Sequence, residues 1–143
     1  MNWKELKDQV IDLGFEEDDT YTEYSRVIIN ASNRALQILY STVIPQISDY
    51  LKGKWGKGYT DANGKEQWIY PTRKTITTET NDEDKIFVPT ELEPLVPLLA
   101  AHYIWLDDDL TKATIYWNEY DDLKQQILAT YMRPRGCVIE GGW

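Results

Sequence analysis

The sequence has little of the chemistry on which most enzymes depend. It contains one cysteine, Cys137, and one histidine, His102. A single cysteine excludes a disulfide within the chain and a zinc site built from several thiolates. Any catalytic triad would have to use His102, which lies within a predicted helix close to Tyr103 and Trp105. We expect His102 to pack or hydrogen-bond locally, and we expect no enzyme and no cofactor.

The chain also lacks long apolar runs and an excess of positive charge. No window approaches the roughly 18 apolar residues of a membrane span, so we expect no membrane contact and synthesis as a cytosolic protein. The formal net charge is -9 and the pI is near 4.6. That balance disfavours a protein that wraps nucleic acid, since phosphate neutralisation needs clustered lysine and arginine.

Three consecutive acids, Asp107, Asp108 and Asp109, lie close to His102 and offer ligand types that bind divalent metals. Consecutive side chains point in different directions, however. We therefore expect these acids to cap the following helix and to complement its dipole, with no metal site. Cys137 lies between Gly136 and Val138 without a nearby capping charge pattern, so we do not expect a nucleophile there. The sequence has no glycine-rich phosphate loop.

One segment has the opposite charge from the rest of the chain. Residues 52–74 contain six bases against two acids, a local net charge of +4. The bases are Lys52, Lys54, Lys57, Lys65, Arg73 and Lys74. Two interpretations stay open, a solvated loop whose lysines favour solubility and a projecting contact to a partner or to DNA.

Helical periodicity dominates the N-terminal third. Apolar residues from Trp3 to Leu13 recur at helical spacing, with Asn2 as the cap and Gly14 in the left-handed position that ends a helix. A longer helix begins at a cap on Thr20 or Thr22. Its apolar stripe consists of Tyr24, Val27, Ile28, Ala31, Ala35, Ile38 and Leu39.

Proline and glycine then end the helical region. Pro45 lacks an amide hydrogen and predicts a kink or stop near Val43, with a further turn or two before Gly53. Residues 55–60 and 66–70 flank the turn sequence at 61–64, which predicts a β-hairpin or a long ordered loop. Residues 75–80 and 85–88 predict a second, small strand pair.

Two helices are predicted in the C-terminal half. Thr90 and Glu93 have the spacing of a capping box for a helix that runs to about Asp107. The next helix has an apolar stripe of Ala113, Tyr116, Trp117, Tyr120, Leu123 and Ile127, and Pro134 and Gly136 end it. The predicted fold is mainly α, a small bundle of about four helices with a hairpin or loop insertion at residues 52–88. We expect one domain over residues 1–143 with an extended tail at residues 133–143.

The aromatic composition is unusual, with six Trp and ten Tyr but only two Phe. Tyr and Trp combine a large apolar area with a polar group, which favours surfaces that are buried against another protein. We expect such an interface at Trp55, Tyr59, Trp68, Tyr70 and Trp143. For Trp105, Tyr116, Trp117 and Tyr120 the favoured interpretation is core packing.

A family resemblance rests on three segments. The run LLAAHYIWLDDD after a proline, an alanine in the next helix followed by YWNEYDDLKQQI, and the pattern VIINASNRALQIL in the long helix resemble the small helical head-tail connector proteins of tailed bacteriophages. These proteins are also called head-completion or adaptor proteins. The basic segment 52–74 has no counterpart that can be matched residue by residue.

The resemblance implies a structural virion protein. Such a protein forms a ring, commonly of twelve copies, beneath the portal protein and extends the DNA channel toward a tail or stopper protein. It is made in the host cytoplasm and resides in the neck of the virion. The acidic composition is consistent with a channel that lets double-stranded DNA pass without binding it.

Three other functions remain as alternatives. A metal-dependent enzyme would use His102 and the three consecutive acids and would need to bind a divalent metal. A tail-completion or stopper protein of the same virion would share the acidity but would be richer in strands. A small helical regulator that binds a host protein would need neither a ring nor a portal.

Overall fold

The computed structural model describes residues 1–15 and 20–132. The α-helices in this part are α1 (Trp3–Gly14), α2 (Thr20–Ile38), α3 (Ser48–Leu51), α4 (Leu95–Trp105) and α5 (Leu110–Tyr131). The strands β1 (Lys57–Thr60) and β2 (Glu66–Ile69) form a two-stranded antiparallel sheet. The predicted fold class, a small helical bundle with a β-hairpin insertion, is confirmed.

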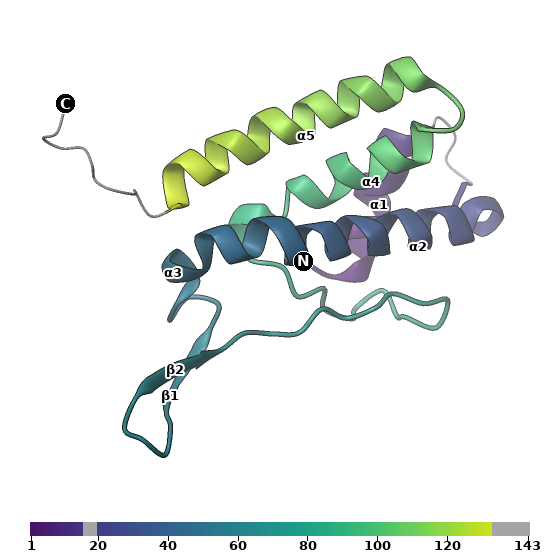
Figure 1. The fold of residues 1–143 in the computed structure, drawn as a ribbon. Coiled ribbons are helices and arrows are strands. Elements are labelled where there is room, and N and C mark those ends of the chain that lie inside the picture. The colour runs from purple at the N-terminus through teal and green to yellow at the C-terminus, as the bar shows by residue number, and fades with distance from the viewer. Residues whose placement is uncertain (16–19, 133–143) are drawn as a thin grey trace, which may run out of the picture.

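Helix α4 lies at the centre of the bundle and contacts α1, α2 and α5 (Figure 1). Its side chains are apolar around most of the helix, and those of Leu95, Val96, Leu99 and Ala100 are completely buried. A helix that is hydrophobic on all sides is stable only when other elements surround it. The sequence of α4 therefore explains its central place, and α1, α2 and α5 cover it.

Helix α1 begins as predicted but ends differently. The Asn2 side chain accepts a hydrogen bond from the Glu5 amide at 2.8 Å, and the Glu5 carboxylate accepts one from the Asn2 amide at 2.9 Å. The left-handed conformation predicted for Gly14 was wrong, because Gly14 is still helical and Phe15 follows in an extended conformation with φ of -146°. A Cβ atom on Gly14 would lie 2.9 Å from Cδ1 of Ile104. Gly14 thus allows α1 to approach α4 closely.

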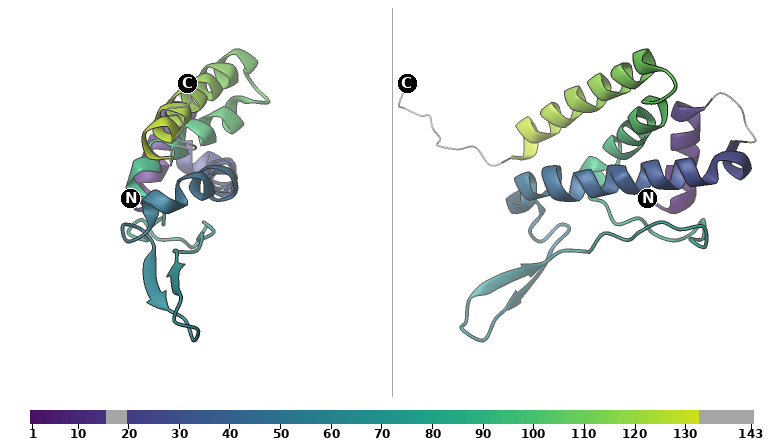
Figure 2. Two further views of the ribbon diagram at one scale, coloured as in Figure 1. Left: turned by 60° about the vertical axis from the view of Figure 1, so that its left-hand side comes forward. Right: turned by 45° about the vertical axis from the view of Figure 1, so that its right-hand side comes forward.

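The buried face of α2 matches the predicted stripe only in its later turns. Ile28, Ala31, Ala35 and the following Leu39 are buried, and Ser32 and Leu36 join them. The prediction was wrong for Tyr24 and Val27, which are 41% and 42% exposed. The first turns of α2 extend beyond the other helices in Figure 1 and in the right view of Figure 2. The Tyr24 ring stacks instead on Phe15, with ring centres 5.3 Å apart.

The chain bends around Pro45 as predicted. A π-helical turn at Leu39–Val43 leads into a 3-10 turn at Ile44–Ile47, and α3 adds one further helical turn. Proline lacks the amide hydrogen that an α-helix would use, and the change of helix type accommodates this loss. Gly53 has φ of 77° and ends the helical region.

The hairpin is confirmed, with Lys57 opposite Ile69 and Thr60 opposite Glu66. Its turn is held by Asp61, whose carboxylate accepts hydrogen bonds from the amides of Asn63 and Lys65, each at 2.9 Å. These hydrogen bonds lower the pKa of Asp61, and the bond from the Lys65 amide has the largest effect. All views in Figures 1 and 2 show the hairpin projecting away from the helices.

The second predicted strand pair, residues 75–80 and 85–88, was wrong. Neither segment forms a β-strand, because backbone groups in both segments hydrogen-bond to other parts of the chain. The Ile76 backbone bonds to the Asn33 side chain of α2, while the Ile86 amide donates to the Met1 carbonyl at 3.0 Å. The buried side chains of Ile76, Ile86 and Val88 fix this long connection to the bundle.

The two C-terminal helices match the prediction only in part. The predicted capping box at Thr90 was wrong, since Thr90–Leu92 is a 3-10 turn without a side-chain cap and the Glu93 carboxylate lies 3.0 Å from the Met1 amino group. Helix α4 ends at Trp105, two residues before the predicted end. Asp109 caps α5 as predicted and accepts from the Lys112 amide at 3.1 Å. Pro134, Gly136 and the predicted tail lie outside the described residues.

No helix within residues 1–15 and 20–132 has the length and apolar character needed to cross a membrane.

Candidate interaction surface on the projecting hairpin

An aromatic cluster attaches the hairpin to the helical bundle. The ring centre of Trp55 lies 5.9 Å from that of Tyr40 and 5.9 Å from that of Tyr70. The Tyr70 hydroxyl donates to the Ser48 carbonyl at 3.1 Å, and the Tyr40 hydroxyl donates to the Phe87 carbonyl. Burial raises the pKa of Tyr40 to about 12. Of the predicted interface residues, Trp55 and Tyr70 therefore already make contacts within the chain.

One face of the hairpin is covered by its own aromatic rings. A Cβ atom on Gly56 would lie 2.5 Å from the Tyr70 ring, and one on Gly58 would lie 2.9 Å from the Trp68 ring. Glycine at these two positions leaves room for the rings to lie across β1. Trp68, another predicted interface residue, is thereby half-buried.

The opposite face of the hairpin is largely exposed, apart from Gln67, whose Nε2 donates to the Asp61 carboxylate at 3.2 Å. Side chains alternate along a strand, so Lys57 and Tyr59 share this face with their cross-strand partners Ile69 and Gln67. Tyr59 is 48% exposed and Ile69 is 61% exposed. We call these four residues the free hairpin face. The sequence prediction missed Ile69, although its alternation with Trp68 in β2 would have placed it opposite the covered face.

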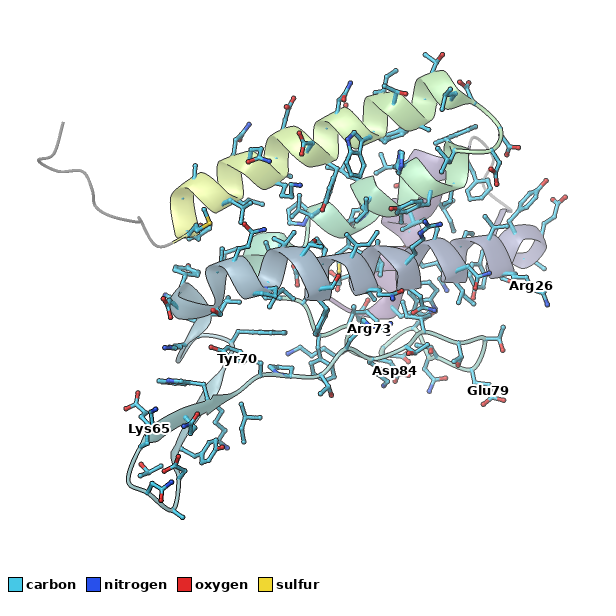
Figure 3. The ribbon with its side chains drawn as sticks, viewed as in Figure 1. Arg26, Lys65, Tyr70, Arg73, Glu79 and Asp84 are labelled. Carbon is cyan, nitrogen blue, oxygen red and sulfur yellow. The ribbon has the colours of Figure 1, made fainter. Side chains whose placement is uncertain are left out.

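The six predicted basic residues do not form one patch. They extend from the hairpin tip near Lys65 to the connection beneath α2 near Arg73 (Figure 3). Lys52 and Lys74 are ion-paired, with Asp49 at 3.2 Å and Asp84 at 3.9 Å, and Lys54 lies 5.0 Å from the Tyr50 ring centre. Lys57, Lys65 and Arg73 are exposed and make no ion pair with an acid in the described ranges.

A shallow cavity of about 380 Å³ lies at the base of the hairpin, lined by Lys54, Trp55, Pro89, Thr90 and Glu91. Beside it, the Tyr50 hydroxyl donates to the Glu91 carboxylate at 2.7 Å. This hydrogen bond is the main reason why the pKa of Tyr50 is raised to about 12. The cavity has one acid and one base and resembles a docking surface more than a reaction centre.

The acid triplet and His102 have structural roles. His102 donates from Nδ1 to the Ala113 carbonyl at 2.8 Å, and its ring centre lies 5.2 Å from that of Trp117. The predicted local packing of His102 is confirmed. Asp109 is the cap of α5, while Asp107 and Asp108 are exposed in the turn before it. Across residues 1–15 and 20–132, no three His, Cys, Asp or Glu side chains gather as a metal site would require.

A second surface, which the sequence analysis did not identify, lies between α1 and α5. This groove has a volume of about 320 Å³, and we call it the α1–α5 groove. It is lined by Asp12, Leu13, Phe15, Trp105, Lys112, Ile115, Tyr116 and Glu119. The Trp105 indole donates to the Leu13 carbonyl at 3.0 Å, and Lys112 Nζ lies 4.2 Å from the Trp105 ring centre.

The aromatic residues expected in the core fall into two groups. Tyr120 is buried, and burial raises its pKa to about 12. Trp105 and Tyr116 are half-buried in the α1–α5 groove, and Trp117 is 39% exposed beside His102. Core packing is thus confirmed for Tyr120 and was wrong for Trp117. Trp143 lies outside the described residues.

Comparison of the chain with protein families, curated proteins and solved structures found no match.

Proposed function

We propose that this protein is a head-tail connector, or adaptor, of a tailed bacteriophage. It assembles as a ring beneath the portal protein and extends the DNA channel toward the tail. The proposal rests on the sequence resemblance described above. The structural observation that supports it best is the projecting hairpin, whose free face exposes the apolar side chains of Tyr59 and Ile69.

The distribution of charge agrees with this proposal. A ring that conducts DNA must avoid binding it tightly, and a net charge of -9 per copy repels phosphate through the summed field. The bases of residues 52–74 are dispersed, and two of them are neutralised by Asp49 and Asp84. A dispersed set of bases favours contacts with protein over a DNA-binding face.

The proportion of secondary structure favours the connector over the stopper alternative. A stopper or tail-completion protein is expected to be richer in strands, whereas the part of the chain that the structure describes has a single two-stranded sheet. The regulator alternative has no specific observation in its favour.

The test is binding to the portal protein encoded in the same phage or prophage genome. The chain is mixed with assembled portal and analysed by native mass spectrometry and particle imaging, with portal alone as the control. We expect a stoichiometric ring of this chain on one end of the portal. A correctly assembled portal that binds no copies of the chain would contradict the proposal.

A further inference from the structure

We propose that the free hairpin face of one copy docks in the α1–α5 groove of a second copy. This contact joins neighbours in the ring and therefore rests on the proposed function. The exposure, charge and placement of the two surfaces support it.

The hairpin has the properties of a segment that needs a partner. A two-stranded hairpin alone in water is marginally stable, and this one is packed on only one face. On the other face Tyr59 is 48% exposed and Ile69 is 61% exposed, and Lys57 lies directly opposite Ile69 in the register. Covering these apolar side chains is favourable, since burial of apolar surface contributes about 25 cal/mol per Å².

The α1–α5 groove offers the matching chemistry. Its apolar lining includes Phe15, Trp105 and Ile115, which is itself 49% exposed. Asp12 and Glu119 also line the groove and give it carboxylates for a lysine. The groove also contains Lys112, whose Nζ lies 4.2 Å from the Trp105 ring centre, so its two acids exceed its bases by one. A face made of one base and two large apolar side chains thus meets a partly apolar groove with a net negative charge.

Overall charge favours another copy of this chain as the partner. Residues 52–74 have a net charge of +4, so the remainder of the chain, with -13, accounts for the total of -9. Two copies that met through like surfaces would repel each other, whereas hairpin against helical body brings opposite charges together. Such complementarity steers association and fixes orientation.

The placement of the two surfaces makes the contact head-to-tail. In Figure 1 the hairpin lies at the lower left, whereas the start of α5 lies at the upper right, and both views of Figure 2 agree. The hairpin and the start of α5 thus lie on opposite sides of one copy. Each copy then presents one hairpin and one groove, and such contacts close into a ring when the rotation between neighbours allows.

Charge reversal and restoration test the contact. Lys57→Glu and Glu119→Lys are made singly and together, and self-association is measured by sedimentation velocity over a concentration series. We expect each single variant to weaken association about tenfold, and the double variant to recover most of the loss. Glu79→Lys makes the same charge change as Glu119→Lys at an exposed residue that lines neither surface, and it is expected to leave association unchanged.

A second variant tests the apolar part. Tyr59→Thr combined with Ile69→Thr keeps residues that favour strands and removes the apolar side chains, so the hairpin itself is retained. We expect this variant to remain monomeric at concentrations at which the wild-type chain associates. A circular-dichroism spectrum equal to that of the wild type verifies the fold.

The outcomes separate this inference from the proposed function. A wild-type chain that stays monomeric throughout, or single variants that associate like the wild type, would overturn the hairpin contact even if the chain forms a ring on the portal. Changed association of the variants together with no portal binding would leave the contact standing and reject the connector. If Lys57→Glu abolished binding to duplex DNA and left association intact, the hairpin would be a DNA contact and the inference would be wrong.

Discussion

Asn33 on α2 and Ile76 in the long connection are joined by two hydrogen bonds. The Asn33 amide nitrogen donates to the Ile76 carbonyl at 2.8 Å, and the Asn33 carbonyl oxygen accepts from the Ile76 amide at 2.8 Å. One side chain thus satisfies both backbone groups of a residue 43 positions away in the sequence. This pair fixes the connection, and with it the direction in which the chain leaves the hairpin.

Replacement of Asn33 by aspartate is expected to lower the free energy of unfolding by about 1–3 kcal/mol. The carboxylate still accepts from the Ile76 amide, but it cannot donate, and its oxygen faces the Ile76 carbonyl. Urea unfolding followed by tryptophan fluorescence measures the effect. Asn30→Asp introduces the same charge at an exposed position of α2 and serves as the control. Equal losses in the two variants would show that the charge, not the hydrogen bond, is responsible.

The cap of α5 is expected to depend on one of three consecutive acids. Asp109→Ala removes the acceptor for the Lys112 amide and should destabilise the protein by about 1 kcal/mol. Asp108→Ala removes the same charge from the exposed turn and should change stability by less than about 0.5 kcal/mol. Thermal unfolding of both variants measures the two changes in stability. Equal effects would mean that the helix dipole, and not the cap, determines the contribution of these acids.

Gly14 and Ile104 are expected to show energetic coupling. An alanine at Gly14 would place its Cβ 2.9 Å from Cδ1 of Ile104, and Ile104→Val removes that methyl group. Gly14→Ala should therefore be more favourable in the Ile104→Val background than in the wild type, by about 0.5–1.5 kcal/mol. Chemical unfolding of the wild type, the two single variants and the double variant gives the coupling energy of this double-mutant cycle. Additive effects would contradict the close approach of α1 and α4.

Tyr120 is expected to make stability fall at alkaline pH. Its pKa is about 12 in the folded protein, because burial disfavours the phenolate and the nearby Tyr103 and Asp121 add to the effect. In the unfolded chain the pKa of a tyrosine is about 10. Between these two values the unfolded state binds fewer protons, so the free energy of unfolding decreases as the pH rises. The stabilising contribution is complete below about pH 10 and lost by about pH 12.

The measurement for Tyr120 compares urea unfolding at about pH 9 and about pH 11. Tyr120→Phe should lose less stability than the wild type between these two conditions. Tyr59→Phe removes the same hydroxyl from the exposed hairpin face and serves as the control. A Tyr120→Phe variant that loses as much stability as the wild type would reject this origin of the pH dependence.

Several features of the fold follow from local rules and were predictable. The cap at Asn2, the bend around Pro45, the turn at residues 61–64 and the cap at Asp109 each depend on residues within a few positions of one another. Local geometry is sufficient for such features, because the atoms that interact are held close by the chain itself. The aromatic residues of the hairpin were also recognised, although not which of its faces stays free.

The predictions that failed concern partners far away in the sequence. Thr90 and Glu93 have the spacing of a capping box, yet the Glu93 carboxylate lies beside the amino group of Met1. The β-branched residues 75–80 suit a strand, yet Ile76 bonds to a side chain of α2. Propensity cannot identify which distant group completes a hydrogen bond, because that choice depends on how the helices pack.

The sequence alone determined the helical periods, the caps at Asn2 and Asp109, the hairpin and the contrast between a basic segment and an acidic chain, since these depend on near neighbours and on composition. Only the tertiary structure decided that α4 lies at the centre, that Gly14 serves a close contact, and that Tyr59 and Ile69 face away from the bundle while α1 and α5 form a groove. Those features arise when elements distant in sequence bury apolar surface together, and the residues that remain exposed are set by that packing.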